Sequence, residues 1–368
     1  MPDTLPAIAE RIQSAELVLP AAPFDETLGF FTSRLGFRVE TIYPADRPST
    51  AVVVGHGLRL RLDRQGSGDG GALVLACRDA DAVAGGFRRL TAPNGTQIEL
   101  VDADPPVVVP PLVATLSVVH AGPQAVWGTG RAGMQYRDLI PDRQGGRFIA
   151  SHIRIPEGGP VPDYAHFHKV RFQAIFCHRG WVKVVYEDQG EPFVMQAGDC
   201  VLQPPQIRHR VLEASSGLEV VEIGCPAEHE TRGDLSITLP TGISAPERRF
   251  GGQRFSRHHA VDASWQDVSP TRQERCTGIS AATEGLAGVR VVRLAPSSAP
   301  AWMHHEGEFL FWFVRAGAAA LEVEGEAPIQ LGLDDAVTVP PHRRFRLMPG
   351  PGLELLEVTL PGALPLFA

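Results

Sequence analysis

Apolar residues along most of this chain occur in short runs that alternate with polar residues and end at glycine or proline. The chain contains 38 glycines and 32 prolines, spread over its whole length. Short runs rich in Val, Leu and Ile between such residues are typical of β-strands. Only residues 25–35 and 80–90 place apolar side chains at the spacing of a helix. The pattern therefore predicts a mainly β protein with few helices.

Around these two helices the predicted elements recur in the same order. The first unit has one strand, the helix and three further strands, predicted over residues 15–19, 25–35, 37–43, 50–54 and 58–62. The second unit has a strand over residues 72–77, the helix over 80–90 and a strand over 95–101. The first unit thus has the order βαβββ, and the second is a shortened copy of it.

Two motifs in this region resemble those of the vicinal oxygen chelate (glyoxalase-like) family. They are Phe30-Phe31-(x3)-Leu35-Gly36-Phe37 and Pro93-Asn94-Gly95-(x2)-Ile98-Glu99-Leu100, and the resemblance covers roughly residues 10–104. Members of that family often bind a metal through a His or Glu on each of four strands. Glu16 and Glu99 occupy two of those places, but Ala72 stands where His is common. The resemblance therefore implies a glyoxalase-like α+β domain that serves as a structural or ligand-gating module rather than as a metal site.

Proline marks a boundary after this region. Residues 104–111 contain four prolines, and sequence this rich in proline is stiff and cannot continue a central strand. A second, softer boundary lies in residues 226–256, which are rich in charge, glycine and proline. We therefore divide the chain into a first domain over residues 1–104, a Pro-rich linker over 105–119, a domain over 120–230, and a linker with a last domain over 231–368.

The two segments after the first boundary are similar to each other. The motif His166-Phe-His168-(x11)-Gly180 corresponds to Met303-His-His305-(x11)-Gly317, and residues 198–205 correspond to residues 334–341. A repeat of about 137 residues that is made of short strands implies a tandem of like β domains.

A pair of histidines in the first copy predicts a metal site. Side chains alternate along a strand, so His166 and His168 are expected on one face. His209 follows on a later strand. Three neutral imidazoles are good ligands for Fe, Mn, Ni, Cu or Zn and leave coordination positions for water, substrate or dioxygen. Tyr164 shares the face of the pair and is predicted to lie beside the metal.

These motifs resemble the cupin superfamily, whose fold is a small antiparallel β-barrel of jelly-roll type. The resemblance covers about residues 120–365 and implies two barrels in tandem. In cupins the pattern His-x-His-(x3 or x4)-Glu and a later His bind the metal at the barrel centre. The resemblance thus implies His166, His168 and His209 as ligands, with Gln173 where the family usually has Glu. Both this family and the glyoxalase-like family commonly dimerise, so a homodimer is expected.

The second copy departs from the cupin pattern. At the four ligand positions it has Met303, His305, Leu310 and Phe345, so a single imidazole of three remains. One His without partners holds a divalent ion poorly, and the second barrel is expected to support the first. A shifted site is the alternative, and its candidate ligands are His304, His305, Glu306 and Glu308.

The amide of Gln173 has a consequence for the chemistry of the site. A divalent ion held by neutral imidazoles keeps its full formal charge, which favours anionic ligands such as enolates, phenolates and carboxylates. Gln173 is therefore predicted to bind the metal weakly or to orient a bound water, and with Tyr164 it forms the predicted catalytic set. We expect Fe(II), with Mn, Ni, Zn and Cu left open.

Composition and charge restrict the partners and the compartment. The formal net charge of −8 argues against a nucleic acid or an anionic membrane as partner. The five cysteines are odd in number and contain no C-x-x-C, and no run of about 18 apolar residues occurs. We therefore expect a cytoplasmic protein that acts on a small anionic or enolisable molecule.

Three functions agree with these observations. The first is a metal-dependent dioxygenase that cleaves a C–C bond of an enolisable or phenolic small molecule, because three-His cupin dioxygenases look similar at the metal. The second is a non-redox isomerase, lyase or hydrolase in which the ion polarises a carbonyl group. The third is a sensor that binds a small molecule without turnover.

Overall fold

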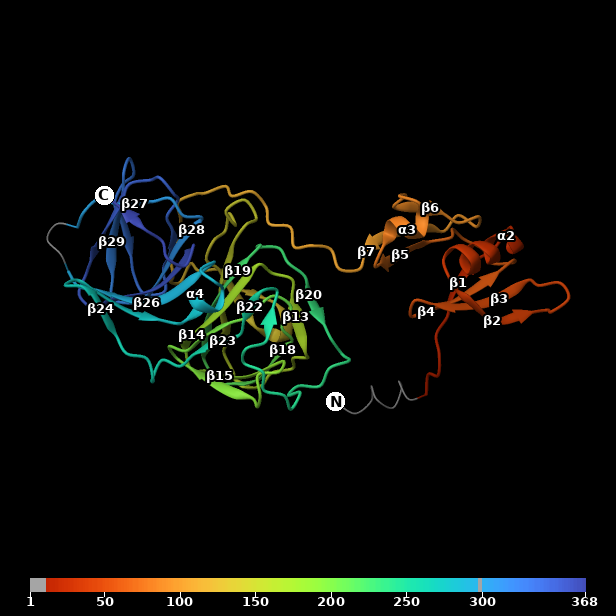
Figure 1. Cartoon of the computed structure of the whole chain (residues 1–368), viewed down its shortest axis with the longest axis horizontal. Coiled ribbons are helices and arrows are strands. Elements are labelled where there is room, and N and C mark those ends of the chain that lie inside the picture. Colours follow the sequence, from red (N-terminus) through yellow and green to blue (C-terminus); the bar gives the residue numbers. More distant parts are fainter. Residues whose placement is uncertain (1–10, 297–299) are drawn as a thin grey trace. The chain divides into compact units, whose positions relative to one another are not determined.

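The computed structural model describes residues 11–296 and 300–368 of the chain (Figure 1). The chain divides into two compact units, Met1–Pro106 and Val107–Ala368. Strands make up most of the regular structure in both units, and the helices are short. The predicted mainly β protein is therefore confirmed. Within the described ranges, no helix has both the length and the apolar character needed to cross a membrane.

The first unit begins with the predicted βαβββ order. Its elements are β1 (Leu17–Pro20), α2 (Phe24–Gly29), η1 (Phe30–Arg34), β2 (Arg38–Tyr43), β3 (Thr50–Gly55) and β4 (Leu58–Asp63). The strands form a sheet in the order β1-β4-β3-β2, with β1 parallel to β4. Phe31 is fully buried between the helical segment and this sheet. The apolar spacing that predicted a helix over residues 25–35 thus comes from side chains that form the core of this unit.

In the second part of this unit the helix is shorter than predicted. It consists of β5 (Ala72–Cys77), α3 (Ala80–Ala84), β6 (Arg89–Thr91) and β7 (Gln97–Asp102), and the strand order is β5-β7-β6. The helix that we predicted over residues 80–90 ends at Ala84. Gly85 caps it in the left-handed conformation, with a φ of 63°, and such glycines terminate helices. Of the apolar residues that follow, Leu90 belongs to β6 and Phe87 is exposed outside any strand, so the helical spacing there was misleading.

The two carboxylates that the glyoxalase-like resemblance assigns to metal positions form ion pairs. Glu16 accepts hydrogen bonds from Arg59 at 3.1 Å and from Arg61 at 2.7 Å. The hydrogen bond from Arg61 is the main cause that lowers the pKa of Glu16. Glu99 lies 3.8 Å from the guanidinium of Arg89. Both carboxylates therefore already have cationic side chains as partners.

The second unit contains two β-barrels. In the first barrel a seven-stranded sheet of order β23-β17-β14-β19-β11-β10-β9 faces a sheet of order β16-β15-β18-β13-β20, which β12 extends through β18. The elements of this half are β9 (Gly128–Thr129), η2 (Arg131–Gly133), β10 (Gln135–Asp138), β11 (Ile149–Ile155), β12 (Gly159–Pro160), β13 (His166–His168), β14 (Phe172–Arg179), β15 (Trp181–Tyr186), β16 (Phe193–Gln196), β17 (Cys200–Leu202), β18 (His209–Ala214), β19 (Leu218–Cys225), β20 (Thr231–Gly233), β21 (Arg249–Phe250), β22 (Gln253–Arg254) and β23 (Ser256–His258).

The second barrel repeats this plan. A seven-stranded sheet of order β24-β25-β26-β33-β28-β31-β8 faces a sheet of order β30-β29-β32, and β27 pairs with β34. Its elements are β8 (Ser117–Val119), β24 (Gln266–Ser269), β25 (Arg272–Cys276), α4 (Ile279–Ala282), β26 (Gly288–Leu294), β27 (His304–His305), β28 (Phe309–Ala316), β29 (Ala319–Val323), β30 (Ile329–Leu331), β31 (Ala336–Thr338), β32 (Phe345–Pro349), β33 (Leu353–Leu360) and β34 (Leu366–Phe367).

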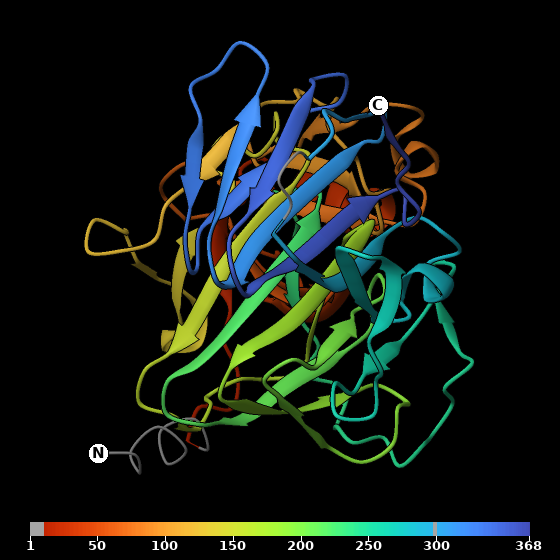
Figure 2. The same cartoon turned by 90° about the vertical axis from the view of Figure 1, so that its left-hand side faces the viewer.

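The two seven-stranded sheets pack on each other. One core cluster contains Phe172, Phe176 and Val221 from the first barrel together with Phe311 and Leu356 from the second. Figure 2 shows long strands of the first barrel, in yellow-green to green, beside those of the second, in light to dark blue. The opposite face of each sheet lines the interior of its own barrel. Each long strand thus buries both of its faces, and Gln173 and Ile175 of β14 point into the first barrel between buried neighbours.

Each barrel also receives a strand from a predicted linker. Ser117–Val119 (β8) pairs with β31 of the second barrel, although it precedes the first barrel in sequence. Ser256–His258 (β23) pairs with β17 of the first barrel. These exchanges bind the two barrels together through backbone hydrogen bonds as well as through the apolar core.

Candidate metal centre

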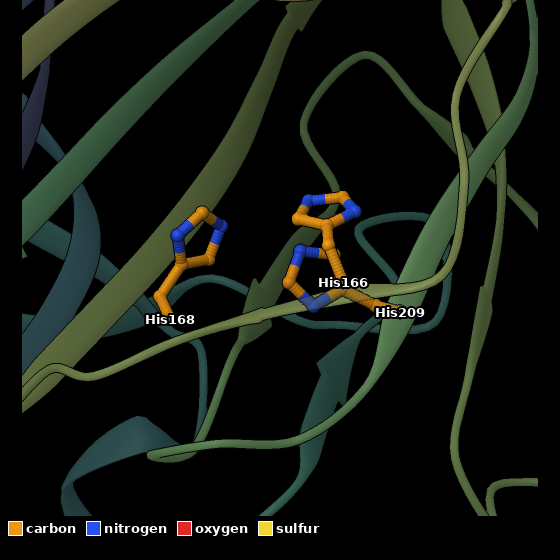
Figure 3. Close-up of side chains that lie close together, drawn as sticks. All are labelled: His166, His168 and His209. Carbon is orange, nitrogen blue, oxygen red and sulfur yellow. The ribbon is translucent and has the colours of Figure 1, made fainter. Parts of the chain in front are cut away.

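Three histidines meet inside the first barrel (Figure 3). His166 and His168 lie on β13, and His166 is the register partner of His209 at the start of β18. The ring centroids are 4.2 Å apart for His166 and His209 and 5.2 Å apart for the other two pairs. One nitrogen of each ring lies within 4.8 Å of the others. The structure therefore brings together the three predicted ligands on adjacent strands.

Neighbouring groups hold the Nδ1 atom of each ring. His166 Nδ1 donates to the carbonyl of Tyr164 at 2.8 Å, and His209 Nδ1 donates to that of Ile207 at 3.0 Å. His168 Nδ1 lies 3.0 Å from the hydroxyl of Thr231. Such contacts at Nδ1 orient an imidazole and leave Nε2 as the ligand atom. The three rings thus have the arrangement that a metal-binding imidazole requires.

Burial keeps the imidazoles neutral. It lowers the pKa of His168 from 6.5 to about 2, with the neighbouring His166 as the next cause. Burial likewise lowers the pKa of His166, and it lowers that of His209 well below its ordinary value. A histidine must be neutral to bind a metal ion. The three residues therefore fit a divalent transition metal near neutral pH.

Two polar side chains donate hydrogen bonds to the Nε2 atoms of His166 and His209. Arg131 of η2 donates to His166 Nε2 at 2.9 Å and forms an ion pair with the buried Asp163. Gln203 donates to His209 Nε2 at 3.2 Å. A nitrogen lone pair serves one partner at a time, so a metal ion on these rings would require both donors to turn away. Arg131 and Gln203 were not predicted as site residues.

Gln173 lies in the cavity but is engaged by other side chains. Its amide oxygen accepts a hydrogen bond from Gln203 at 3.2 Å, and its amide nitrogen donates to Glu222 at 2.5 Å. The hydroxyl of Tyr186 in turn donates to Gln203 at 2.9 Å. Gln173 is thus part of a chain of hydrogen bonds that ends at a carboxylate.

Tyr164 does not reach the cavity. Its side chain is 46% exposed, and its ring lies over Gly233 rather than among the lining residues. Its backbone carbonyl, not its hydroxyl, takes part in the site through His166. Two further residues of β14 share the face of Gln173 by strand alternation. Ile175 lines the cavity, whereas Cys177 is fully buried in the barrel core, where burial raises the pKa of its thiol to about 12.

The cavity beside the histidines is small and largely apolar. Its volume is about 100 Å³, and its apolar lining includes Ile153, Ile175, Val184 and Met195. Glu222 is an acidic side chain in this lining that the sequence prediction missed. A signal for it does exist, because Leu218-Glu-Val-Val-Glu222 and Leu353-Glu-Leu-Leu-Glu357 are equivalent parts of the repeat.

The described residues of the second barrel contain no equivalent set of ligands. Met303 forms a bridge with Phe345, as His166 pairs with His209 in the first barrel. Leu310 and Phe345 are buried in an apolar core, and His305 Nε2 lies 2.8 Å from the carbonyl of Val339, to which it donates. Apolar side chains therefore stand at three of the four ligand positions of this barrel.

The candidate ligands of a shifted site in the second barrel are also separated. Glu308 pairs with Arg147 at 2.8 Å and with Arg171 at 2.7 Å, both from the first barrel. In residues 11–296 and 300–368, no group of three close metal-binding side chains includes any of the four predicted candidates. Among the residues that the structure describes, the other such group is His178, Glu219 and Asp334, where Arg179 already contacts both carboxylates.

Comparisons with known proteins identify the fold of the first barrel. Residues 151–223 match the family model described as "Cupin domain", so this segment is a cupin domain. None of the curated proteins matches the sequence significantly.

Structural neighbours extend the similarity to both barrels. Oxalate decarboxylase from Bacillus subtilis is 13% identical, with a TM-score of 0.50 over 67% of this chain and 76% of that one. Salicylate 1,2-dioxygenase from Pseudaminobacter salicylatoxidans is 15% identical, with a TM-score of 0.50 over 69% of this chain and 86% of that one. At these identities the likeness concerns the fold alone. The Bacillus protein has Mn(II) centres.

We expect the metal-free protein to lose stability as the pH falls below about 6.5. The unfolded chain binds protons on His168 below its ordinary pKa of 6.5, whereas the folded chain does so only near a pKa of about 2. The free energy of unfolding therefore falls with decreasing pH, and the slope for this residue rises to about 1.4 kcal/mol per pH unit once the unfolded histidine is fully protonated. Urea denaturation between pH 7 and pH 5 measures this slope. His168→Gln should have a shallower slope, and an unchanged slope would contradict the assignment.

Proposed function

We propose that this chain is a mononuclear metal-dependent cupin enzyme, and that it is a dioxygenase acting on a small enolisable or phenolic anion. The observation that carries this proposal is the set of three neutral imidazoles, two buried and one partly buried, with an amide, Gln173, beside them instead of a ligand carboxylate. A divalent ion bound by these rings keeps its full formal charge. Anionic oxygen donors are the ligands that such a site prefers.

The proposed ion is Fe(II). Imidazole ligands suit iron, and they also suit manganese, nickel, zinc and copper, so availability decides among them. The Mn(II) centres of the structurally similar oxalate decarboxylase support manganese as the main alternative. The bound ion would supply Lewis acidity and, in the case of iron, the electrons for chemistry with dioxygen.

The side chains around the histidines support an anionic substrate. Arg131 is the one guanidinium in the described cavity lining, and the buried Asp163 holds it in place. When Arg131 releases His166, its N–H groups become available to a carboxylate or enolate oxygen, which they bind well. The apolar side chains around the cavity keep water away from the bound substrate, and this strengthens the charge interactions within it.

Oxygen uptake tests this proposal. Protein loaded with one equivalent of Fe(II) should consume dioxygen in an oxygen electrode when it is given a suitable enolisable or phenolic compound, with acetylacetone and salicylate as the first probes. His166→Ala should show none of this uptake, because it lacks a ligand. If a fully loaded protein consumes no dioxygen with any enolisable or phenolic compound in a broad panel, the dioxygenase proposal is wrong.

A non-redox isomerase or lyase is the second candidate, and Glu222 favours it. A carboxylate inside the cavity can move a proton without any oxidant. Turnover of an enolisable compound by the zinc-loaded protein in the absence of dioxygen would support this candidate against the first.

We also propose that the N-terminal unit is a glyoxalase-like module without a metal. The strand order β1-β4-β3-β2 supports the resemblance. The ion pairs of Glu16 with Arg59 and Arg61 support a structural role for that carboxylate.

A further inference from the structure

The carboxylate of Glu222 lies on a face of β19 that is otherwise apolar. Leu218 and Val220 point into the same cavity, because side chains two residues apart share a face of a strand. In the sheet Glu222 lies opposite Ile175 of β14 and Ser151 of β11. A charged group in such a position is costly unless it is paired, so a specific role is needed to account for it.

The repeat provides an internal comparison for this residue. Its equivalent in the second barrel, Glu357, accepts hydrogen bonds from the indole of Trp312 at 2.9 Å and from Arg272 at 2.8 Å. Glu222 accepts one hydrogen bond, from Gln173. No cationic side chain of the described residues lies within 4 Å of it. Glu357 is therefore engaged by a guanidinium and an indole, whereas Glu222 retains free acceptor capacity toward the cavity that holds the three histidines.

A directed chain of hydrogen bonds positions Glu222. The hydroxyl of Tyr186, whose pKa is raised by burial, donates to the amide oxygen of Gln203. The amide nitrogen of Gln203 donates to the oxygen of Gln173, whose own nitrogen donates to Glu222. Each amide is thereby fixed in one orientation, and the carboxylate at the end accepts.

This chain also accounts for the amide at position 173. A glutamate there would place a second carboxylate within hydrogen-bonding distance of Glu222. Two carboxylates this close cannot both ionise readily, so one of them would take up a proton. Gln173 instead offers Glu222 a hydrogen-bond donor and adds no second charge, and Gln173 is therefore a positioning residue.

We propose that Glu222 is the catalytic base of the first barrel. This role rests on the function proposed above. Glu222 accepts the acidic proton of the enol or phenol as the substrate enters the site. The O–H bond of the substrate breaks, and the proton forms a new O–H bond with the carboxylate of Glu222. The electron pair stays on the substrate oxygen, which becomes the anionic group that the site binds. The proton returns to the product oxygen or to water when the product leaves.

Calorimetry on the zinc-loaded protein tests this role without any turnover. The probe is acetohydroxamic acid, a small acid that binds divalent ions as its anion. It is titrated at pH 7 in buffers of different ionisation enthalpy, which reveals how many protons reach the buffer. The native protein should release almost none, because Glu222 takes the proton, and Glu222→Gln should release about one per bound probe. Glu222→Asp should behave like the native protein, and so should Glu213→Gln, which changes an exposed glutamate of β18.

The outcomes separate this inference from the function on which it rests. If the protein binds no stoichiometric zinc, the proposed function fails. If zinc binds but the native protein and Glu222→Gln release the same number of protons, Glu222 is not the base. The inference also fails if the zinc-loaded native protein does not bind the probe. An infrared difference spectrum of the native protein provides a check that needs no variant, since a protonated carboxyl band should appear when the probe binds and its absence would contradict the proposal.

Discussion

Replacing His209 by alanine should abolish stoichiometric binding of a divalent metal ion to this protein. The imidazole is buried, its Nδ1 is fixed by the carbonyl of Ile207, and its ring lies 4.2 Å from that of His166. Loss of one of three nitrogen ligands leaves two, which hold a first-row divalent ion poorly. We expect the affinity for Mn²⁺ or Zn²⁺ to fall by about 100-fold or more, because even changes to groups that only orient a ligand cost about 10- to 100-fold.

Elemental analysis after dialysis and a calorimetric titration with Zn²⁺ measure this effect. The matched control is His305→Ala, which removes the one remaining histidine of the second barrel's ligand positions. That variant should bind the same single equivalent as the native protein, because His305 Nε2 is engaged by the carbonyl of Val339. Retention of one equivalent by His209→Ala, or its loss in His305→Ala, would refute the assignment of the ligands.

Replacing Phe311 by alanine should lower the free energy of unfolding by about 3–5 kcal/mol, since truncating a buried aromatic ring leaves a cavity. Phe311 is fully buried in the core that the two seven-stranded sheets share. Its ring stacks on that of Phe309, with the centroids 6.0 Å apart. Since both barrels pack on this core, urea denaturation of the variant should remain a single transition for the second unit, at a lower midpoint.

The control for this prediction is Leu235→Ala, because Leu235 is 89% exposed. Its free energy of unfolding should change by no more than about 0.5 kcal/mol. A loss of less than about 1 kcal/mol in Phe311→Ala would contradict the shared core, given the usual cost of such truncations. Separate transitions for the two barrels, followed through the metal site and through Trp312, would also contradict it.

Much of the fold could be predicted because it depends on local alternation and on repetition. Short apolar runs between glycines and prolines predicted most strands, and the repeated motifs predicted two like barrels. The prediction from apolar spacing failed where a glycine ended a helix early. The helix expected over residues 80–90 ends at Ala84, because Gly85 adopts a left-handed conformation and a strand begins at Arg89.

The histidines of the site could be predicted because two of them lie on one strand. Tyr164 was placed beside the metal by the same rule of alternation, but β13 begins only at His166, so the rule does not extend back to residue 164. Glu222 and Arg131 come from segments far away in sequence, and only the closed barrel brings them to the cavity. Local patterns carry no information on such contacts, although the alignment of the two repeats contained a hint for Glu222.

One measurement tests the central claim most directly. Crystals of the protein grown with Mn²⁺ should be measured at wavelengths on both sides of the manganese absorption edge. We predict a single anomalous peak per chain inside the first barrel, bound by Nε2 of His166, His168 and His209, with Arg131 turned away from His166. No peak at these histidines in manganese-saturated crystals, or a peak in the second barrel near His305, would contradict the account.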